Sequence, residues 1–233
     1  MRHRVQILGW TLIWSGLFII GYLGWQLIGT DVVNARAQAE AELQLVASLE
    51  QTRLELPPVE EVAVPTTAPV SAPGTVEYHQ ENLPEEDSEF AHMSIERLGV
   101  EAVVFEGVSQ QTLARGPGHM PGTSLPGQPG NAVISGHRTT YGAPFFDFDL
   151  LKPGDRIEIE TAIGTHVYEV RESFVVLPTY VWVTNDKPGG WLTLTTCSPK
   201  FSARERLIIT AELVEGPNVD YISVLEGRLE SVS

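Results

Sequence analysis

Cys197, the one cysteine of this 233-residue chain, closes a stretch whose pattern predicts a β-strand. Residues 191–196 alternate and are rich in threonine, so the cysteine falls on the face opposite the apolar one. A second alternating stretch, residues 206–213, starts with Arg206. If the two strands pair as a hairpin, the thiol and the guanidinium face each other on its open side. Positive charge near a thiol favours the nucleophilic thiolate, which predicts covalent catalysis; the alternative is an inert, half-buried thiol.

A histidine in a second stretch could supply a proton-transferring group. Of the six histidines, His137 alone ends an apolar, strand-like stretch, and Gly136 before it lets the chain bend and present the ring. The remaining histidines lie in tail, linker, loop or strand-start positions. We therefore treat His137 as the candidate general acid and base.

These motifs together resemble the sortase family of cysteine transpeptidases. The resemblance rests on Thr-Leu-Thr-Thr-Cys at 193–197 with an arginine nine residues later, and on Ile-Ser-Gly-His-Arg at 134–138. It spans roughly residues 90–215, and the phrases at 137–142 and 150–155 are most similar to class E.

The resemblance implies a mainly β fold, a closed eight-stranded barrel, and a set of site residues. It implies that His137, Cys197 and Arg206 are catalytic. It also implies that the loop before the cysteine strand shapes the substrate pocket, although its aromatic residues could equally anchor the core. The expected substrate-binding residues are Thr195, Thr196, Tyr180 and Trp182.

The strand pattern agrees with such a barrel. Short alternating segments separated by Gly, Pro and Asp predict seven strands, with an eighth to be found around residues 116–125. Only two short helical pieces are expected, near 109–114 and 146–151. The seven predicted strands lie at 92–99, 101–106, 131–137, 155–162, 166–176, 191–197 and 206–214.

The N-terminus carries a predicted membrane span. Residues 5–30 contain no charge, and the apolar part as a helix would be about 34 Å long, enough to cross a bilayer. Arg2 and Arg4 precede this stretch and Asp31 follows it, which predicts a single-pass protein with a cytoplasmic N-terminus and an extracellular catalytic domain. The alternative is a signal peptide cleaved near residues 35–37.

Composition divides the rest of the chain. An Ala-, Glu- and Leu-rich stretch predicts a juxtamembrane helix, and a stretch rich in Pro and Glu predicts a disordered linker. The expected segments are 1–30 (N-terminus and transmembrane helix), 31–56 (helix), 57–89 (linker), 90–215 (catalytic barrel) and 216–233 (C-terminal tail).

Charge and motif content exclude several functions. A net charge of −15 argues against nucleic acid as a partner. One cysteine allows no internal disulfide. Neither HxxEH nor CxxC spacing occurs, so we expect no metal and no other cofactor.

The resemblance implies that the protein cleaves an LPxTG- or LAxTG-like sorting signal of secreted proteins after its threonine. The acyl group would then be joined to an amine of a peptidoglycan precursor. One alternative is a pilin-polymerising sortase, although the Asp-Pro-aromatic lid usual in that class has no counterpart in residues 57–90. The other alternative is a non-catalytic extracellular barrel that binds a partner.

Overall fold

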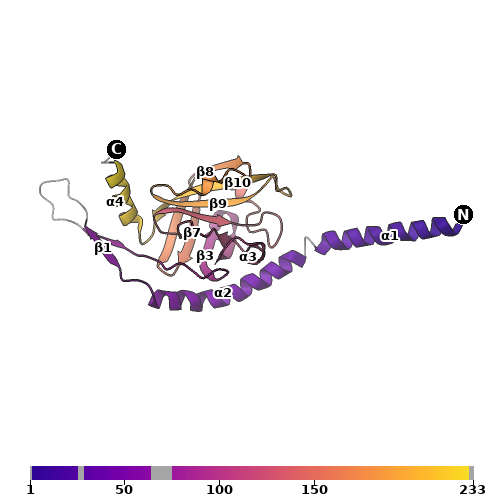
Figure 1. Cartoon of the computed structure of the whole chain (residues 1–233), viewed down its shortest axis with the longest axis horizontal. Coiled ribbons are helices and arrows are strands. Elements are labelled where there is room, and N and C mark those ends of the chain that lie inside the picture. Colours follow the sequence, from indigo (N-terminus) through magenta and orange to yellow (C-terminus); the bar gives the residue numbers. More distant parts are fainter. Residues whose placement is uncertain (1, 26–28, 64–74, 231–233) are drawn as a thin grey trace.

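The computed structural model describes residues 2–25, 29–63 and 75–230, and its centre is a closed barrel of eight strands (Figure 1). The order around the barrel is β10-β8-β7-β3-β4-β5-β6-β9. This confirms the mainly β, eight-stranded fold expected from the sequence. The barrel strands are β3 Glu89–Ile95, β4 Val100–Glu106, β5 Gly118–His119, β6 Gly130–Ser135, β7 Arg156–Thr161, β8 Gly164–Val176, β9 Gly190–Ser198 and β10 Glu205–Glu215.

The strand missing from the sequence pattern is β5. It is only two residues long and pairs with β4 and β6, so no alternation of side chains could reveal it. Short helices connect the strands: α3 Gln110–Arg115 is capped by the Ser109 side chain, and 3-10 turns occupy Glu96–Leu98, Phe148–Leu150 and Val181–Thr184.

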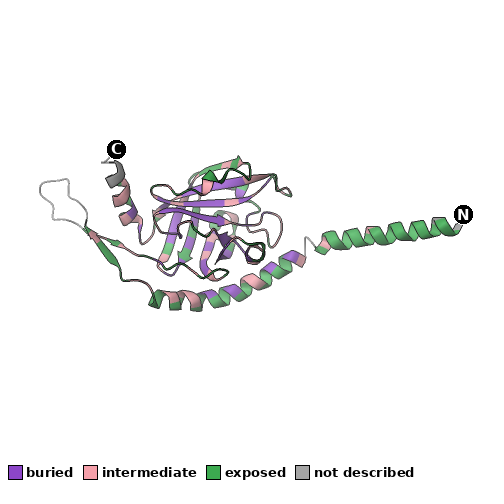
Figure 2. Cartoon of the chain, in the orientation of Figure 1, coloured by how far each residue is buried: buried purple, intermediate pink, exposed green. Residues whose placement is uncertain are grey.

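The barrel interior forms the main hydrophobic core, shown by the buried faces of the strands in Figure 2. On β9 and β10 it takes the alternate residues that the sequence predicts. Leu192 and Leu194 of β9 are fully buried, and the matching β10 residues are Leu207, Ile209, Ala211 and Leu213. Because side chains alternate along a strand, this register sends Cys197 to the opposite face.

Helix α2 (Thr30–Leu54) occupies most of the segment 31–56 and lies along the barrel instead of standing free (Figure 1). Ala41 and Leu45 pack against Val103 and Phe105 in a second hydrophobic cluster. The Gln38 side chain accepts a hydrogen bond from the backbone nitrogen of Val103 at 2.8 Å. The helix is therefore part of the catalytic domain's packing.

The linker also differs from the expected disordered stalk. Strands β1 Glu60–Ala63 and β2 Thr75–Tyr78 pair with each other, while residues 64–74 lie outside the described residues. The segment after β2 is fastened to the barrel: the backbone nitrogen of His79 donates to Asn218 at 2.8 Å, and that of Ala162 donates to Glu81 at 3.0 Å. Composition did not predict this because the partners lie far away in the sequence.

The described part of the expected C-terminal tail is mostly helical. Helix α4 (Val219–Glu230) follows Asn218, and its Ile222 enters the barrel core. The ring of Tyr221 lies 4.4 Å from that of Tyr78, centroid to centroid. The tail and the linker therefore support each other at one end of the barrel.

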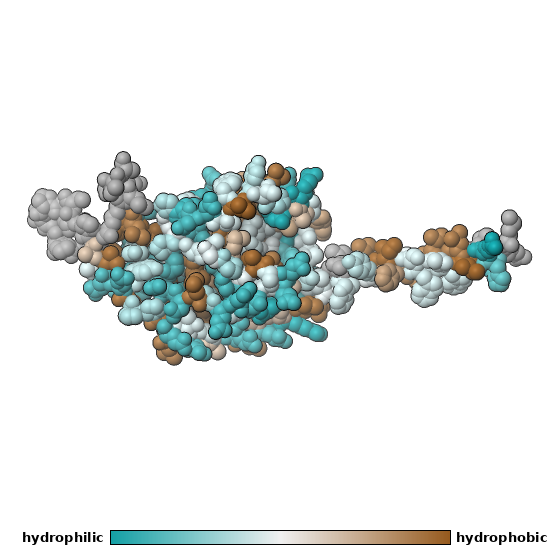
Figure 3. Space-filling model, viewed as in Figure 1, coloured by the Kyte–Doolittle hydropathy of each residue, from teal (hydrophilic) through white to brown (hydrophobic). Residues whose placement is uncertain are grey.

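Helix α1 (Arg2–Gly24) is apolar and exposed. Its segment Gln6–Gly24 is long and hydrophobic enough to cross a membrane, a test that a signal sequence also passes. Figure 3 shows hydrophobic residues gathered along α1, whereas the visible face of the barrel is mostly hydrophilic. Water does not favour the exposure of so many apolar side chains along one helix. The structure therefore supports α1 as a candidate membrane span.

Candidate active site

The hairpin β9–β10 brings the thiol and the guanidinium together. Arg206 is the register partner of Cys197, as the alternation of the two strands predicts. Both residues line a pocket of about 300 Å³ at this end of the barrel. Cys197 is partly exposed, which leaves its thiol accessible to a ligand.

His137 reaches the same pocket through the neighbouring strand. Strand β6 runs parallel to β9, with Ser135 opposite Thr195, so both chains leave the barrel at the same rim. Two hydrogen bonds extend the pairing past the strand end: the backbone nitrogen of Gly136 donates to the Thr195 carbonyl at 3.1 Å, and the Thr196 hydroxyl donates to the Gly136 carbonyl at 2.7 Å.

The turn at residue 136 requires a glycine. A Cβ at this position would lie 2.7 Å from the ring of Phe145. The His137 ring beyond it packs on Tyr141, with 4.9 Å between the ring centroids. Partial burial lowers the pKa of His137 below its ordinary value of 6.5, because burial disfavours the charged imidazolium. The imidazole is therefore neutral at pH 7 and able to accept a proton.

Arg206 is held by the hairpin turn that precedes it. Its Nη1 donates to the carbonyls of Ala203 at 3.0 Å and of Glu205 at 2.9 Å. These bonds use one nitrogen of the guanidinium. The remaining N–H groups can donate to an oxygen that lies over Cys197.

The four expected substrate-binding residues divide into three kinds. Thr195 and Tyr180 line the pocket, and Tyr180 is half exposed. Thr196 also borders the pocket, but its hydroxyl is engaged by Gly136. Trp182 does not line it; its ring stacks on that of Phe174, 6.0 Å away. The pocket's further wall is largely apolar and includes Val108, Leu113, Met120, Val176, Leu177 and Val181.

Sequence reasoning missed Arg138, the residue after the histidine. It is 5% exposed, and its Nη1 donates to the Cys197 carbonyl at 3.2 Å. Its Nη2 lies 2.8 Å from Asp149, and its Nε donates to the Phe146 carbonyl at 3.4 Å. One buried guanidinium thus joins the cysteine strand to the loop that follows His137. The only sequence signal was the position of this arginine beside the histidine.

Among the described residues, no group of three or more His, Cys, Asp and Glu side chains is placed to hold a metal ion. The pocket itself brings together a thiol, an imidazole and a guanidinium.

Comparison with known proteins agrees with this geometry. The sequence profile of the sortase domain matches residues 93–214, just over half of the chain. Sortase SrtE1 of Streptomyces coelicolor is 35% identical over 142 residues, which cover 54% of this chain and 40% of that protein. This chain thus matches less than half the length of that relative.

Solved structures give the same result. A Clostridium perfringens sortase D5 transpeptidase superposes with a TM-score of 0.58 at 25% identity, over 79% of this chain and 99% of that chain. Sortase E1 from Streptomyces coelicolor, solved with a tripeptide in the active site, has a TM-score of 0.53 at 34% identity, over 55% of this chain and 88% of that chain. With the domain match, the eight-stranded barrel and these relatives in agreement, the chain belongs to the sortase family and is similar to its class E members.

Proposed function

We propose that this protein is a membrane-anchored cysteine transpeptidase with Cys197 as nucleophile, His137 as general acid and base, and Arg206 as the donor to the reacting oxygen. The observation that carries the proposal is that all three side chains line one pocket, from three different strand ends. The proposal covers residues 90–215 as the catalytic unit.

In the first half-reaction the Cys197 sulfur attacks the carbonyl carbon of the substrate's scissile peptide bond. The neutral His137 ring takes the thiol proton and delivers it to the leaving amine, so the peptide bond breaks and a thioester forms. The free N–H groups of Arg206 donate to the substrate oxygen while its negative charge develops.

In the second half-reaction an acceptor amine attacks the thioester. His137 accepts a proton from that amine and returns it to the departing sulfur, which restores the thiol and leaves a new amide bond. Water in place of the amine would give hydrolysis, so the reaction's outcome depends on which nucleophile reaches the pocket first.

The substrate class follows from the family and the pocket. We infer an LPxTG- or LAxTG-like sorting signal cleaved after threonine, because the wall formed by Leu177, Tyr180 and Val181 is apolar and suits the signal's leucine. The tripeptide bound in the active site of the Streptomyces coelicolor sortase E1 supports peptide binding here. The acceptor would be an amine of a peptidoglycan precursor.

The proposed location is the outer face of the cell membrane. Helix α1 would be the single span, with Arg2 and Arg4 holding the N-terminus in the cytoplasm and the barrel outside.

A peptide-cleavage screen tests the proposal. Peptides with Leu-Pro and Leu-Ala signals are incubated with the protein and with a panel of amines, and products are identified by mass. We expect cleavage after threonine and an amide to the acceptor, both absent with Cys197→Ala. Labelling by a thiol-reactive mimic of the signal, without any cleavage, would instead favour a binding barrel. Head-to-tail joining of pilin-type proteins would favour the polymerising class.

A further inference from the structure

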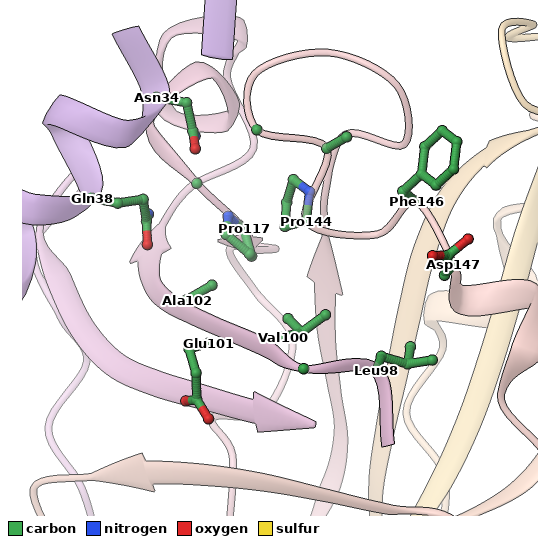
Figure 4. Close-up of a pocket in the computed structure, with 14 residues that line it drawn as sticks. Asn34, Gln38, Leu98, Val100, Glu101, Ala102, Pro117, Pro144, Phe146 and Asp147 are labelled. Atoms are coloured by element: carbon green, nitrogen blue, oxygen red, sulfur yellow. The ribbon is translucent and has the colours of Figure 1, made fainter. Parts of the chain in front are cut away.

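The loop that follows His137 is attached to the first turn of α2. The backbone nitrogen of Gly142 donates to the Asp31 side chain at 2.9 Å. Gly142 has a φ of 72°, and a Cβ there would lie 2.2 Å from Asn34 Oδ1, so only glycine allows this contact. Figure 4 shows Asn34 of α2 on one side of a pocket and Pro144 and Phe146 of this loop on the other.

The same turn of α2 lies next to the candidate membrane span. Helix α1 ends at Gly24, and the ring of Trp25 lies against Gly29. Asp31 is the seventh residue after Gly24, so their Cα atoms can be at most about 25 Å apart. If α1 spans a bilayer, the loop that carries His137 must therefore lie within that distance of its surface.

This end of the barrel exposes apolar side chains. Phe201, in the turn between β9 and β10, is 74% exposed and has a φ of 64°, which is unusual for a bulky residue. Its ring is 6.4 Å from that of Phe146, centroid to centroid. Val32 and Val33, in the first turn of α2, are also close to half exposed. A surface that contacts only water gains no stability from exposing these apolar side chains.

The charge of this end also differs from that of the whole protein. Together with Asp31 of α2, residues 138–149 and 199–206 carry four basic and four acidic residues, whereas the chain carries −15. Lys200 lies over the Phe146 ring at 4.0 Å and pairs with Asp147 at 2.8 Å, while Arg204 is exposed. An aromatic residue flanked by basic residues is typical of segments that rest in the headgroup layer.

We propose that the catalytic end of the barrel docks on the membrane surface, with Phe201 and Phe146 in the headgroup layer and Lys200 and Arg204 near lipid phosphates. The docking rests on the proposed membrane anchor, because the short connection from α1 to Asp31 limits the distance between the bilayer and the loop after His137. It would hold the mouth of the pocket within reach of substrates and acceptors that are themselves attached to lipid.

Site-specific fluorescence in bilayers tests the docking. The full chain with Cys197→Ala is otherwise free of cysteine, so single cysteines can be introduced and labelled. The reporters are Phe201→Cys and, in the same turn, Ala203→Cys. The control is Leu83→Cys: Leu83 is 78% exposed and lies beyond the far end of α2, a helix of 25 residues and about 37 Å. Ile13→Cys in α1 reports on the anchor itself.

Each labelled protein is placed in vesicles of phosphatidylcholine and phosphatidylglycerol, with and without a quencher attached to lipid headgroups. We expect the labels at 201 and 203 to lose most of their emission when the quencher is present, and the label at 83 to keep it. The label at 13 should respond to a quencher on the acyl chains.

Equal emission from positions 201, 203 and 83, with position 13 in lipid, would overturn the docking and leave the anchor intact. A label at 13 that stays in water would refute the anchor and the docking together. Emission that changes with the protein-to-lipid ratio but not with the quencher would show that a second copy covers the turn, which also overturns the proposal.

Discussion

Arg206 is the residue whose geometry is most demanding, because two backbone carbonyls orient its guanidinium toward the pocket. Lysine keeps the charge but not the planar set of donors. We therefore expect Arg206→Lys to lower kcat/KM for peptide cleavage at least tenfold, a cautious part of the roughly 10²–10³ lost with an oxyanion donor. The melting temperature should change little.

The matched control is Arg156→Lys. Arg156 pairs with Glu215 at 2.5 Å on an exposed surface, where an ion pair contributes little to stability. The kcat/KM of the Arg156→Lys variant should equal that of the wild type. Similar, small losses for both variants would mean that Arg206 contributes only surface charge.

In the proposed mechanism Cys197 carries the covalent step, and it contributes little to packing because it is partly exposed at a strand end. Cys197→Ala should abolish both cleavage and transfer, measured with the sorting-signal peptide, and leave the circular dichroism spectrum and thermal unfolding close to the wild type. Normal transfer by this variant would remove the catalytic assignment of all three residues.

Arg138 acts through its neighbours rather than on substrate. Replacing it with methionine leaves the Cys197 carbonyl without its guanidinium donor and Asp149 with Lys200 as its remaining basic partner. We expect kcat to fall more than KM rises, because the reacting groups lose their relative positions while the apolar wall remains. A change in stability with unaltered kcat would show that this arginine has a purely structural role.

Among the elements, helix α2 is held on the barrel because one of its faces is buried there. Leu45 is 4% exposed, whereas Leu43 on the same helix is 82% exposed. Leu45→Ala should reduce the free energy of unfolding by about 2–4 kcal/mol, and Leu43→Ala by less than about 0.5 kcal/mol. Chemical denaturation in detergent measures both, and equal effects would mean that α2 does not pack on the barrel in solution.

The segment between β2 and β3 is fastened by Glu81. Burial raises the pKa of its carboxyl to about 7 from 4.5, so the folded state holds the proton more tightly than the unfolded chain does. The protonated Glu81 side chain therefore makes its full contribution to the free energy of unfolding below pH 4.5, and this contribution is lost as the pH rises to about 7. Relative to the wild type, Glu81→Gln should gain stability progressively across this window, measured by denaturation at several pH values. A constant difference would show that the carboxyl does not titrate on unfolding.

The strands could be predicted because their signal is local: alternation in β9 and β10 also gave the facing of Cys197 and Arg206. Other features depend on distant partners. His79 is fastened by Asn218, 139 residues away, and the contact is absent from any local pattern. Arg138 likewise has its partners on two other segments. Trp182 was expected at the pocket because of its loop, yet it stacks outside on Phe174.

At the scale of the whole molecule, the barrel, α2 and the part of the linker that follows β2 form one packed unit. A fragment of residues 90–233 would expose Val103 and Phe105, which α2 covers, and would lose the bond from Ala162 to Glu81. We expect a fragment of residues 30–233 to melt at a clearly higher temperature than the shorter one, measured by calorimetry. Equal melting temperatures would place the domain boundary at residue 90, as the composition predicts.

Strands β6 and β9 are adjacent and parallel although about 60 residues separate them, so the chain between them must return across the barrel before the second catalytic strand begins. The two side chains proposed to react are thus positioned by backbone ladders, while part of the wall around them, including Leu177, Tyr180 and Val181, belongs to the connection between β8 and β9. Such a division lets the loops lengthen or change composition without moving the reactive atoms. Selectivity for a new signal can therefore evolve separately from reactivity, and exchanging residues 177–189 between relatives is the natural way to transfer it.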